Sequence, residues 1–249
     1  MGAPIDVDHF VEHGWVLTRS HDRVADVLAW ADEVAAWPDG AGEWLHHFEL
    51  TDSGAVLCRT ENFIPFHEGL RALLTDGPML EAAAALLGEE AVLYKEKINY
   101  KLPGGAGYAP HQDAPAYPFV QRHVSCMVAI DDSLVANGCL EVASGHHHEL
   151  LPTDEHGCLR DDVVRALDWV PVEVRAGETL WFHSRAPHRS APNLGSTPRR
   201  ALYPTYNARS EGDLRSAYYA QKRVELARAG DTGRVAVSLI GDFQGRPVR

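Results

Sequence analysis

Apolar residues recur three and four positions apart in three blocks of the first third of the chain, which we expect to be helices: residues 24–34, 68–74 and 79–87. Asp6 and Asp8 suit the start of an earlier helix, and Gly88 suits the end of the third block. We expect a short strand at the apolar residues 15–17. The pattern therefore predicts a mainly helical segment over residues 1–90.

The pattern changes after residue 90 to short runs rich in β-branched and aromatic residues, separated by clusters of Gly, Pro, Asn and Asp. Such runs are typical of an antiparallel sandwich or barrel. They cover residues 91–100, 123–130, 170–174, 178–183 and 200–206. A last helix is expected at 213–229, followed by a polar tail. We interpret residues 1–249 as a single domain with a mainly β core at 91–207, flanked by helices at 1–90 and by a C-terminal helix and tail at 208–249.

The composition narrows the possible partners. The chain of 249 residues carries 23 Lys and Arg against 35 Asp and Glu, a formal net charge of −12. This argues against wrapping nucleic acid, which needs a positive surface. The sequence has no run of about 18 apolar residues that would span a membrane, and residues 1–8 do not resemble a secretory signal. The four cysteines show no CxxC or disulfide-like spacing, so we expect reduced thiols in a cytoplasmic protein.

His111 and Asp113 are the strongest candidates for metal ligands. On an extended strand, residues two apart point to the same face, so one metal ion could take both side chains. A third ligand would come from a distant strand, with His188 as the first candidate and His183 as the second. Two imidazoles and one carboxylate leave coordination positions open, and this is the ligand set of Fe(II) oxygenases.

Arg199 adds a second element to this site. It follows His188 by eleven residues, after a loop rich in Pro, Asn, Gly, Ser and Thr, and stands at the start of the next expected strand. A guanidinium there could pair in bidentate fashion with one end of a dicarboxylate while the other end chelates the metal.

Four motifs, taken in order and spacing, carry a resemblance to a known family. His111 with Asp113, residues 137–146, residues 188–193 and Arg199 resemble the phytanoyl-CoA dioxygenase (PhyH) family, to which ectoine hydroxylases belong. The match extends over roughly residues 94–206. The resemblance implies a double-stranded β-helix (jelly-roll, cupin-like) core with the metal at its open mouth. It also implies Fe(II) and O2 chemistry with 2-oxoglutarate as cosubstrate, and favours His188 over His183 as the third ligand.

The resemblance also assigns roles to other positions. Asn99, Tyr108 and Ser125 match family positions that contact 2-oxoglutarate, and Arg199 would pair with its far carboxylate. Tyr117 and Phe182 match positions that line the substrate pocket. The N-terminal helices and residues 114–122 are expected to shape that pocket as a lid.

The run at 93–101 adds an observation on charge. Strand alternation puts one set of residues on one face, namely Lys95, Lys97, Asn99 and Lys101. The other face takes Tyr94, Glu96, Ile98 and Tyr100. If Asn99 faces the cavity, a lysine does so too, and we expect Lys95 to contact substrate. Lys101 is expected to be a solvated edge-strand charge.

Three prominent features are given no role in the chemistry. Residues 146–148 are consecutive histidines that cannot all face one ion, so we place them at the surface or the pocket rim. His183 alternates away from Phe182 and is expected to be structural. Residues 104–107 lack the strand-to-helix context of a dinucleotide loop and are expected to form a flexible turn.

The sequence therefore predicts an oxygenase that hydroxylates an unactivated C–H bond of a small polar metabolite and releases succinate and CO2. A natural-product intermediate, an amino-acid derivative or a phosphonate would fit, and the lysines favour an anionic group. Two alternatives stay open. One is a cupin-like metalloenzyme that does not use 2-oxoglutarate, and the other is a non-catalytic β-sandwich binding module.

Overall fold

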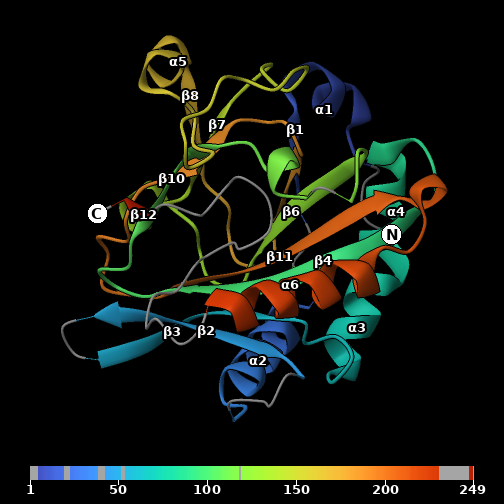
Figure 1. The fold of residues 1–249 in the computed structure, drawn as a ribbon, viewed down its shortest axis with the longest axis vertical. Helices are drawn as coiled ribbons and strands as arrows, with labels where there is room; N and C mark the ends of the chain where they lie inside the picture. The colour runs from blue at the N-terminus through green and yellow to red at the C-terminus, as the bar shows by residue number, and fades with distance from the viewer. Residues whose placement is uncertain are drawn as a thin grey trace.

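Two antiparallel sheets face each other and form the centre of the molecule (Figure 1). The computed structural model describes residues 5–19, 23–38, 43–51, 54–117, 119–229 and 247–248. The larger sheet has the order β1-β9-β6-β11-β4-β3-β2, and the smaller has the order β12-β5-β10-β7-β8. The predicted mainly β fold with flanking helices is confirmed, and the paired sheets are those expected of a double-stranded β-helix.

The strands of the larger sheet are β1 (Trp15–Thr18), β2 (Leu45–Thr51), β3 (Gly54–Glu61), β4 (Ala91–Lys101), β6 (His123–Ala129), β9 (Thr179–His183) and β11 (Arg199–Ala208). Those of the smaller sheet are β5 (Gly107–His111), β7 (Leu140–Ala143), β8 (Trp169–Val172), β10 (His188–Ser190) and β12 (Pro247–Val248). The α-helices are α1 (Val7–His13), α2 (Val24–Ala35), α3 (Glu68–Thr75), α4 (Gly77–Leu87), α5 (Asp161–Ala166) and α6 (Arg215–Ala229). Short 3-10 turns lie at Ala114–Ala116, Val135–Asn137 and Arg209–Glu211.

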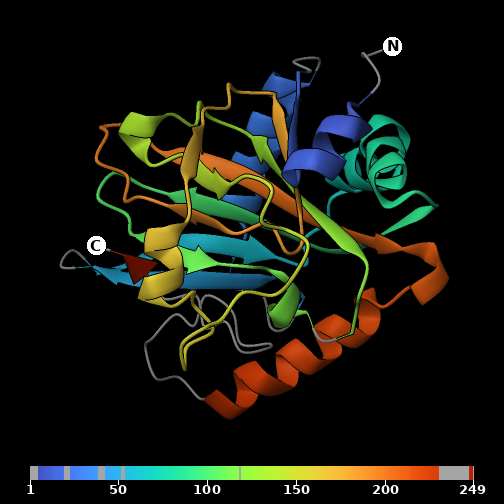
Figure 2. The ribbon, with the colours of Figure 1, turned by 90° about the horizontal axis from the view of Figure 1, so that it is seen from above.

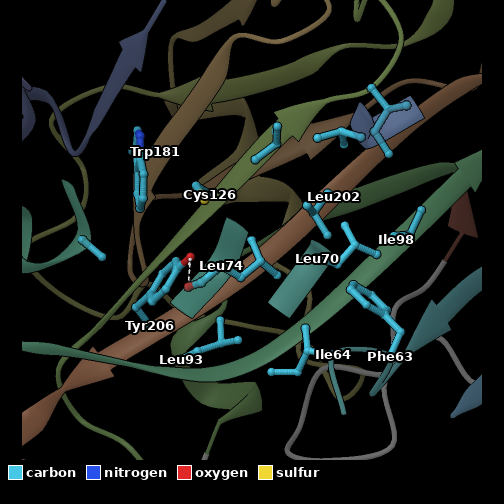
Figure 3. Close-up of a cluster of buried hydrophobic side chains, with 14 of the residues drawn as sticks. Phe63, Ile64, Leu70, Leu74, Leu93, Ile98, Cys126, Trp181, Leu202 and Tyr206 are labelled. Carbon is cyan, nitrogen blue, oxygen red and sulfur yellow. Dashed lines mark hydrogen bonds between the residues drawn. The ribbon is translucent and has the colours of Figure 1, made fainter. Parts of the chain in front are cut away.

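The outer face of the larger sheet packs on the N-terminal helices and forms the main hydrophobic core (Figure 3). Strand residues such as Ile98, Trp181 and Leu202 meet Leu70 and Leu74 of α3, and all five are almost fully buried. Burial of side chains of this size contributes about 1.5–3 kcal/mol each. This face of the larger sheet therefore packs on the helices, and its opposite face packs on the smaller sheet.

A second core lies between the two sheets. It combines Met127, Leu180 and Phe182 of the larger sheet with Leu140 and Val142 of the smaller sheet. These residues fill one part of the space between the sheets. The polar side chains of β4 and β5 face the remaining part, where the candidate site lies.

Most predicted elements lie within two residues of their expected bounds, but two strands contradict the mainly helical N-terminal segment. β2 and β3 form a hairpin that extends the larger sheet beyond β4. Neither has a clean alternation of apolar residues, because β2 is an edge strand and β3 turns the polar Arg59 and Glu61 into the molecule. Periodicity of apolar residues is the main signal for a strand, and it is weak in both.

A β-bulge in β4 corrects the predicted alternation. Lys95 lies opposite Thr205 and Leu93 opposite Tyr206, so Tyr94 is an extra residue on its strand. Leu93 packs in the helix-facing core, whereas the Tyr94 ring lies on the side of the candidate site. The assignment of Tyr94 to the face of Ile98 was therefore wrong, while Lys95, Lys97 and Asn99 share a face as predicted.

Lys101 is also buried, which contradicts its prediction as a solvated charge. Its Nζ donates to Ser190 Oγ at 2.9 Å and to the Ala191 carbonyl at 2.7 Å. β4 is not an edge strand but lies between β11 and β3, and Ser190 and Ala191 contact the Lys101 ammonium from the end of β10 in the other sheet.

Helix α6 runs along one flank of the sheets (Figure 2) and confirms the predicted C-terminal helix, while residues 230–246 of the tail lie outside the described part. Its Arg215 Nη2 donates to Glu96 Oε1 at 2.9 Å, and Tyr219 donates its hydroxyl to the Glu96 carbonyl at 3.1 Å. These contacts fasten α6 to β4. None of the helices described is both long and apolar enough to cross a membrane.

Candidate active site

His111, Asp113 and His188 meet between the two sheets. His111 ends β5 and His188 begins β10, and the two lie directly opposite each other in the antiparallel pair. Asp113 Oδ1 lies 3.8 Å from His111 Nε2 and 3.9 Å from His188 Nε2. Among the described residues, this is the one group of His, Cys, Asp or Glu close enough to share a metal ion.

The turn after β5, not the strand itself, brings Asp113 to the histidines. The strand ends at His111, and Asp113 has a helical backbone, with φ −71° and ψ −30°, before the 3-10 turn Ala114–Ala116. The predicted pair is therefore brought together, but the argument from two residues on one face of a strand was wrong.

Backbone carbonyls fix the orientation of both imidazoles. Nδ1 of His111 donates to the Ala109 carbonyl at 2.7 Å, and Nδ1 of His188 donates to the Ala186 carbonyl at 3.0 Å. A carbonyl only accepts, so each neutral ring keeps its proton on Nδ1 and presents the Nε2 lone pair to the site. Burial, with His188 nearby, lowers the pKa of His111 to about 3, so this ring is neutral at pH 7.

The carboxylate of Asp113 is ionised and held in place. Burial alone would raise its pKa, but His188 and Lys97 outweigh this effect and keep the pKa below its usual range. Ser125 Oγ donates to Asp113 Oδ2 at 3.2 Å and lies 2.9 Å from Thr205 Oγ1. Two neutral imidazoles and one carboxylate fit a divalent iron ion.

A cavity of about 50 Å³ opens beside this triad, room for a few water molecules or a compact ligand. Six other predicted site residues line it: Lys95, Asn99, Tyr108, Tyr117, Ser125 and Phe182. His183 points away from it, toward His147, as expected of a structural residue. Of the three consecutive histidines, His146 and His148 are exposed and His147 is buried.

Arg199 lies near the site but is not part of the cavity wall. Its side chain is buried, and its Nη1 donates to Ser133 Oγ at 3.3 Å. Its Nε has no hydrogen-bond partner, and no carboxylate among the described residues forms an ion pair with it. A buried guanidinium in this state is suited to pair with a carboxylate of a ligand.

Several residues of the cavity wall were not predicted from the sequence. They are Arg59 and Glu61 of β3, Tyr203 and Thr205 of β11, Tyr218 and Lys222 of α6, and also Leu140. β3 and α6 lie far from the motifs in sequence, and only the spacing of Tyr218 and Lys222, four apart on one helix face, gave a signal. The cavity is closed by β3 and α6. No described residue of α1–α4 lines it, so the expected N-terminal lid is corrected, whereas residues 116 and 117 do contribute.

Four cationic side chains surround the cavity: Arg59, Lys95 and Lys222 are buried, and Lys97 is half-buried. Glu61 and Asp113 are the two carboxylates in the wall. Burial lowers the pKa of Lys95 to about 8 and places that of Lys97 well below its usual value. An anion in the cavity would stabilise the charged form of both lysines.

Comparison with known proteins agrees with this geometry. The family model for phytanoyl-CoA dioxygenase (PhyH) matches residues 10–201. A methylphosphonate hydroxylase of Gimesia maris is 49% identical over 233 residues, which cover 92% of this chain and 90% of that protein. A 2-aminoethylphosphonate dioxygenase of an uncultured bacterium is 42% identical over 80% of this chain and 78% of its own length.

A solved structure shows the same fold. The crystal structure of EctD from S. alaskensis with 2-oxoglutarate and 5-hydroxyectoine superposes with a TM-score of 0.73 at 21% identity, over 82% of this chain and 76% of that one. This likeness confirms the jelly-roll core. With the family model and the two relatives, it leads to one conclusion: the chain belongs to the phytanoyl-CoA dioxygenase (PhyH) family.

Proposed function

We propose that this protein is an Fe(II)- and 2-oxoglutarate-dependent dioxygenase that hydroxylates a C–H bond of a small phosphonate and releases succinate and CO2. The observation that supports the substrate class is the set of four cationic side chains beside the triad, three of them buried and Lys97 half-buried. The relatives named for methylphosphonate and 2-aminoethylphosphonate support it. The predicted cytoplasmic location and the lack of a nucleic-acid or membrane partner stay predictions.

His111, Asp113 and His188 would hold the iron. When bound, the iron supplies the activation of O2 that hydroxylation requires. The carbonyls of Ala109 and Ala186 hold the proton of each neutral ring on Nδ1, so that Nε2 would face the iron. Ser125 orients the carboxylate of Asp113.

2-Oxoglutarate would bind between Arg199 and the triad. Arg199 has a buried guanidinium that lacks an anionic partner among the described residues, and a carboxylate would supply one. Tyr108 and Asn99 line the cavity, and Asn99 Oδ1 is held by Arg59 Nε at 2.9 Å. Ser125 also lines the cavity, although its hydrogen bond to Asp113 favours a positioning role.

The phosphonate group would bind to Lys95 and Lys97, with Arg59 nearby. The four cations of the wall exceed its two carboxylates by two charges, which favours an anionic group such as a phosphonate. Tyr117 and Phe182 supply apolar wall on which the target carbon can rest. A cavity of about 50 Å³ suits a compact substrate and does not suit an acyl chain.

The test is turnover with defined phosphonates. The purified enzyme is incubated with Fe(II), 2-oxoglutarate and methylphosphonate, and succinate and the hydroxylated product are measured by chromatography and phosphorus NMR. We expect succinate and hydroxylated phosphonate in equal amounts, and methanesulfonate, which has the same tetrahedral shape but one negative charge, to give little of either. Succinate formation that no phosphonate raises would contradict the proposal. Turnover that continues without 2-oxoglutarate would instead support the cupin-like alternative.

A further inference from the structure

Glu61 is the one carboxylate of the described cavity wall that lies outside the triad, and it is already paired. Its Oε2 lies 2.5 Å from Nζ of Lys222, and both side chains are at most 3% exposed. Nη1 of Arg59 and Nε2 of His47 lie 3.5 Å and 3.4 Å from the other oxygen. A substrate ammonium that approached Glu61 would therefore meet a carboxylate that the chain's own cations already neutralise.

The tyrosine rings that line the cavity also have lysine side chains beside them. Each tyrosine of the described wall has a lysine Nζ within 6 Å of its ring centre. The pairs are Lys95 with Tyr117 at 4.5 Å, Lys97 with Tyr203 at 5.4 Å, Lys101 with Tyr108 at 5.6 Å and Lys222 with Tyr218 at 5.7 Å. Tyrosine faces and carboxylates are the groups that stabilise a buried ammonium. Lys95 and Lys97 are therefore not paired with a carboxylate of the described cavity wall, whereas Glu61 and each tyrosine ring of that wall already contact a lysine of the chain.

We propose that Lys222 is a specificity-determining residue that occupies the ammonium site on Glu61, so that the enzyme selects phosphonates without an amino group. This inference rests on the proposed function and adds the class of phosphonate. An aminoalkyl phosphonate would have to bury its ammonium among like charges, beside a carboxylate that Lys222 and Arg59 already neutralise, which costs binding free energy. Lys222 is the cation to test because its Nζ forms the short contact with Glu61, whereas Lys95 and Lys97 are assigned to the phosphonate.

The experiment compares two substrates that differ by the amine. Ethylphosphonate and 2-aminoethylphosphonate present the same two-carbon chain, so their kcat/KM ratio reports on the ammonium alone. We expect the wild-type enzyme to prefer ethylphosphonate by at least about tenfold. In Lys222→Met, which keeps the length of the side chain and frees Glu61, the ratio should shift toward the amine by at least about tenfold.

The double variant Lys222→Met with Glu61→Gln is the matched control. It removes the carboxylate as well, so the gain for 2-aminoethylphosphonate should vanish. Dissociation constants of both phosphonates are measured by calorimetry without oxygen, so that binding is read apart from turnover, and melting temperatures verify that each variant folds. Damage to the structure would lower kcat/KM for both substrates alike and leave the ratio of the two values unchanged.

Three results would overturn the inference while leaving the proposed function intact. They are a wild-type preference for 2-aminoethylphosphonate, an unchanged ratio in folded Lys222→Met, and a gain for the amine that persists in the double variant. If the wild-type enzyme turns over no phosphonate at all, the proposed function itself fails, and the inference fails with it.

Discussion

Asp113 is the residue on which the interactions of the site converge. Its carboxylate faces both histidines, accepts from Ser125 and lies in the field of Lys97 and Lys95. A rigidly held ligand loses less freedom when a metal binds, and this is why residues behind the ligands affect metal affinity. The hydroxyl of Ser125 is the clearest such residue here.

Ser125→Ala is predicted to weaken metal binding by about tenfold while leaving the fold intact, because Asp113 loses a hydrogen bond but keeps its charge. The measurement is titration with Co(II), whose visible spectrum reports coordination directly. Thr205→Val is the matched control, since it removes the other partner of the Ser125 hydroxyl without touching Asp113. Asp113→Ala should lose more than about 100-fold in affinity. An affinity of Ser125→Ala equal to that of the wild type would remove Ser125 from this role.

The sequence predicted the site residues that lie in motifs, but not those that reach the site from other elements. His111, Asp113 and His188 were identified through their spacing and family resemblance. Arg59 and Lys222 could not be, because they reach the cavity from a hairpin and a helix at opposite ends of the chain. Their contact with the site depends on how the elements pack, and no local pattern records that packing.

Among the elements, β4 shows both the strength and the limit of pattern reading. Alternation placed Lys95, Lys97 and Asn99 on one face correctly, because both faces of the strand are fixed by cross-strand pairing. The bulge at Tyr94 shifted the phase by one residue, and the sequence contains no Gly or Pro there to indicate it. The bulge brings the Tyr94 ring against Tyr218 of α6, at 4.9 Å between ring centres.

The attachment of α6 to β4 gives a prediction on stability. Arg215→Met would leave the fully buried carboxylate of Glu96 without its ion-pair partner, and burial already raises the pKa of this group. We expect the free energy of unfolding to fall by about 3–5 kcal/mol, measured by urea denaturation. Adding Glu96→Gln should recover part of this loss. A fall below about 1 kcal/mol would show that α6 is held by its apolar contacts instead.

For the molecule as a whole, the net charge of the chain is negative, whereas the charge of the cavity wall is positive. The chain carries −12 overall, yet the cavity is lined by four cations against two carboxylates. The negative exterior keeps anions in solution at a distance, and the cationic interior offsets the cost of removing one from water. The overall composition therefore describes the net charge of the chain, but it contains no information about the substrate.

Buried neutral histidines give the whole molecule a predicted acid sensitivity. Burial lowers the pKa of His47 and of His123 to about 3, against about 6.5 in an unfolded chain. Below pH 6.5 the unfolded chain takes up protons that the folded protein does not, so stability falls as the pH falls toward 3. The two sites together contribute about 2.7 kcal/mol per pH unit.

Urea denaturation between pH 7.5 and 4.5 measures this slope. His123→Phe is expected to lower the slope below pH 6 by about 1.4 kcal/mol per pH unit, because one buried site no longer titrates. His148→Gln serves as the control, since that histidine is exposed. A free energy of unfolding that stays constant down to pH 5 would contradict the prediction.

The short strand β10 has a consequence for folding. It spans only His188–Ser190, yet it joins β5 on one side and β7 on the other, with His188 opposite His111. An ion shared by these two histidines would act as a non-covalent cross-link between neighbouring strands. Each tenfold rise of free ion above its dissociation constant would add about 1.4 kcal/mol to stability. Amide hydrogen exchange in β10 should become slower as the concentration of free ion rises. The stability of the smaller sheet would then depend on how much metal is available.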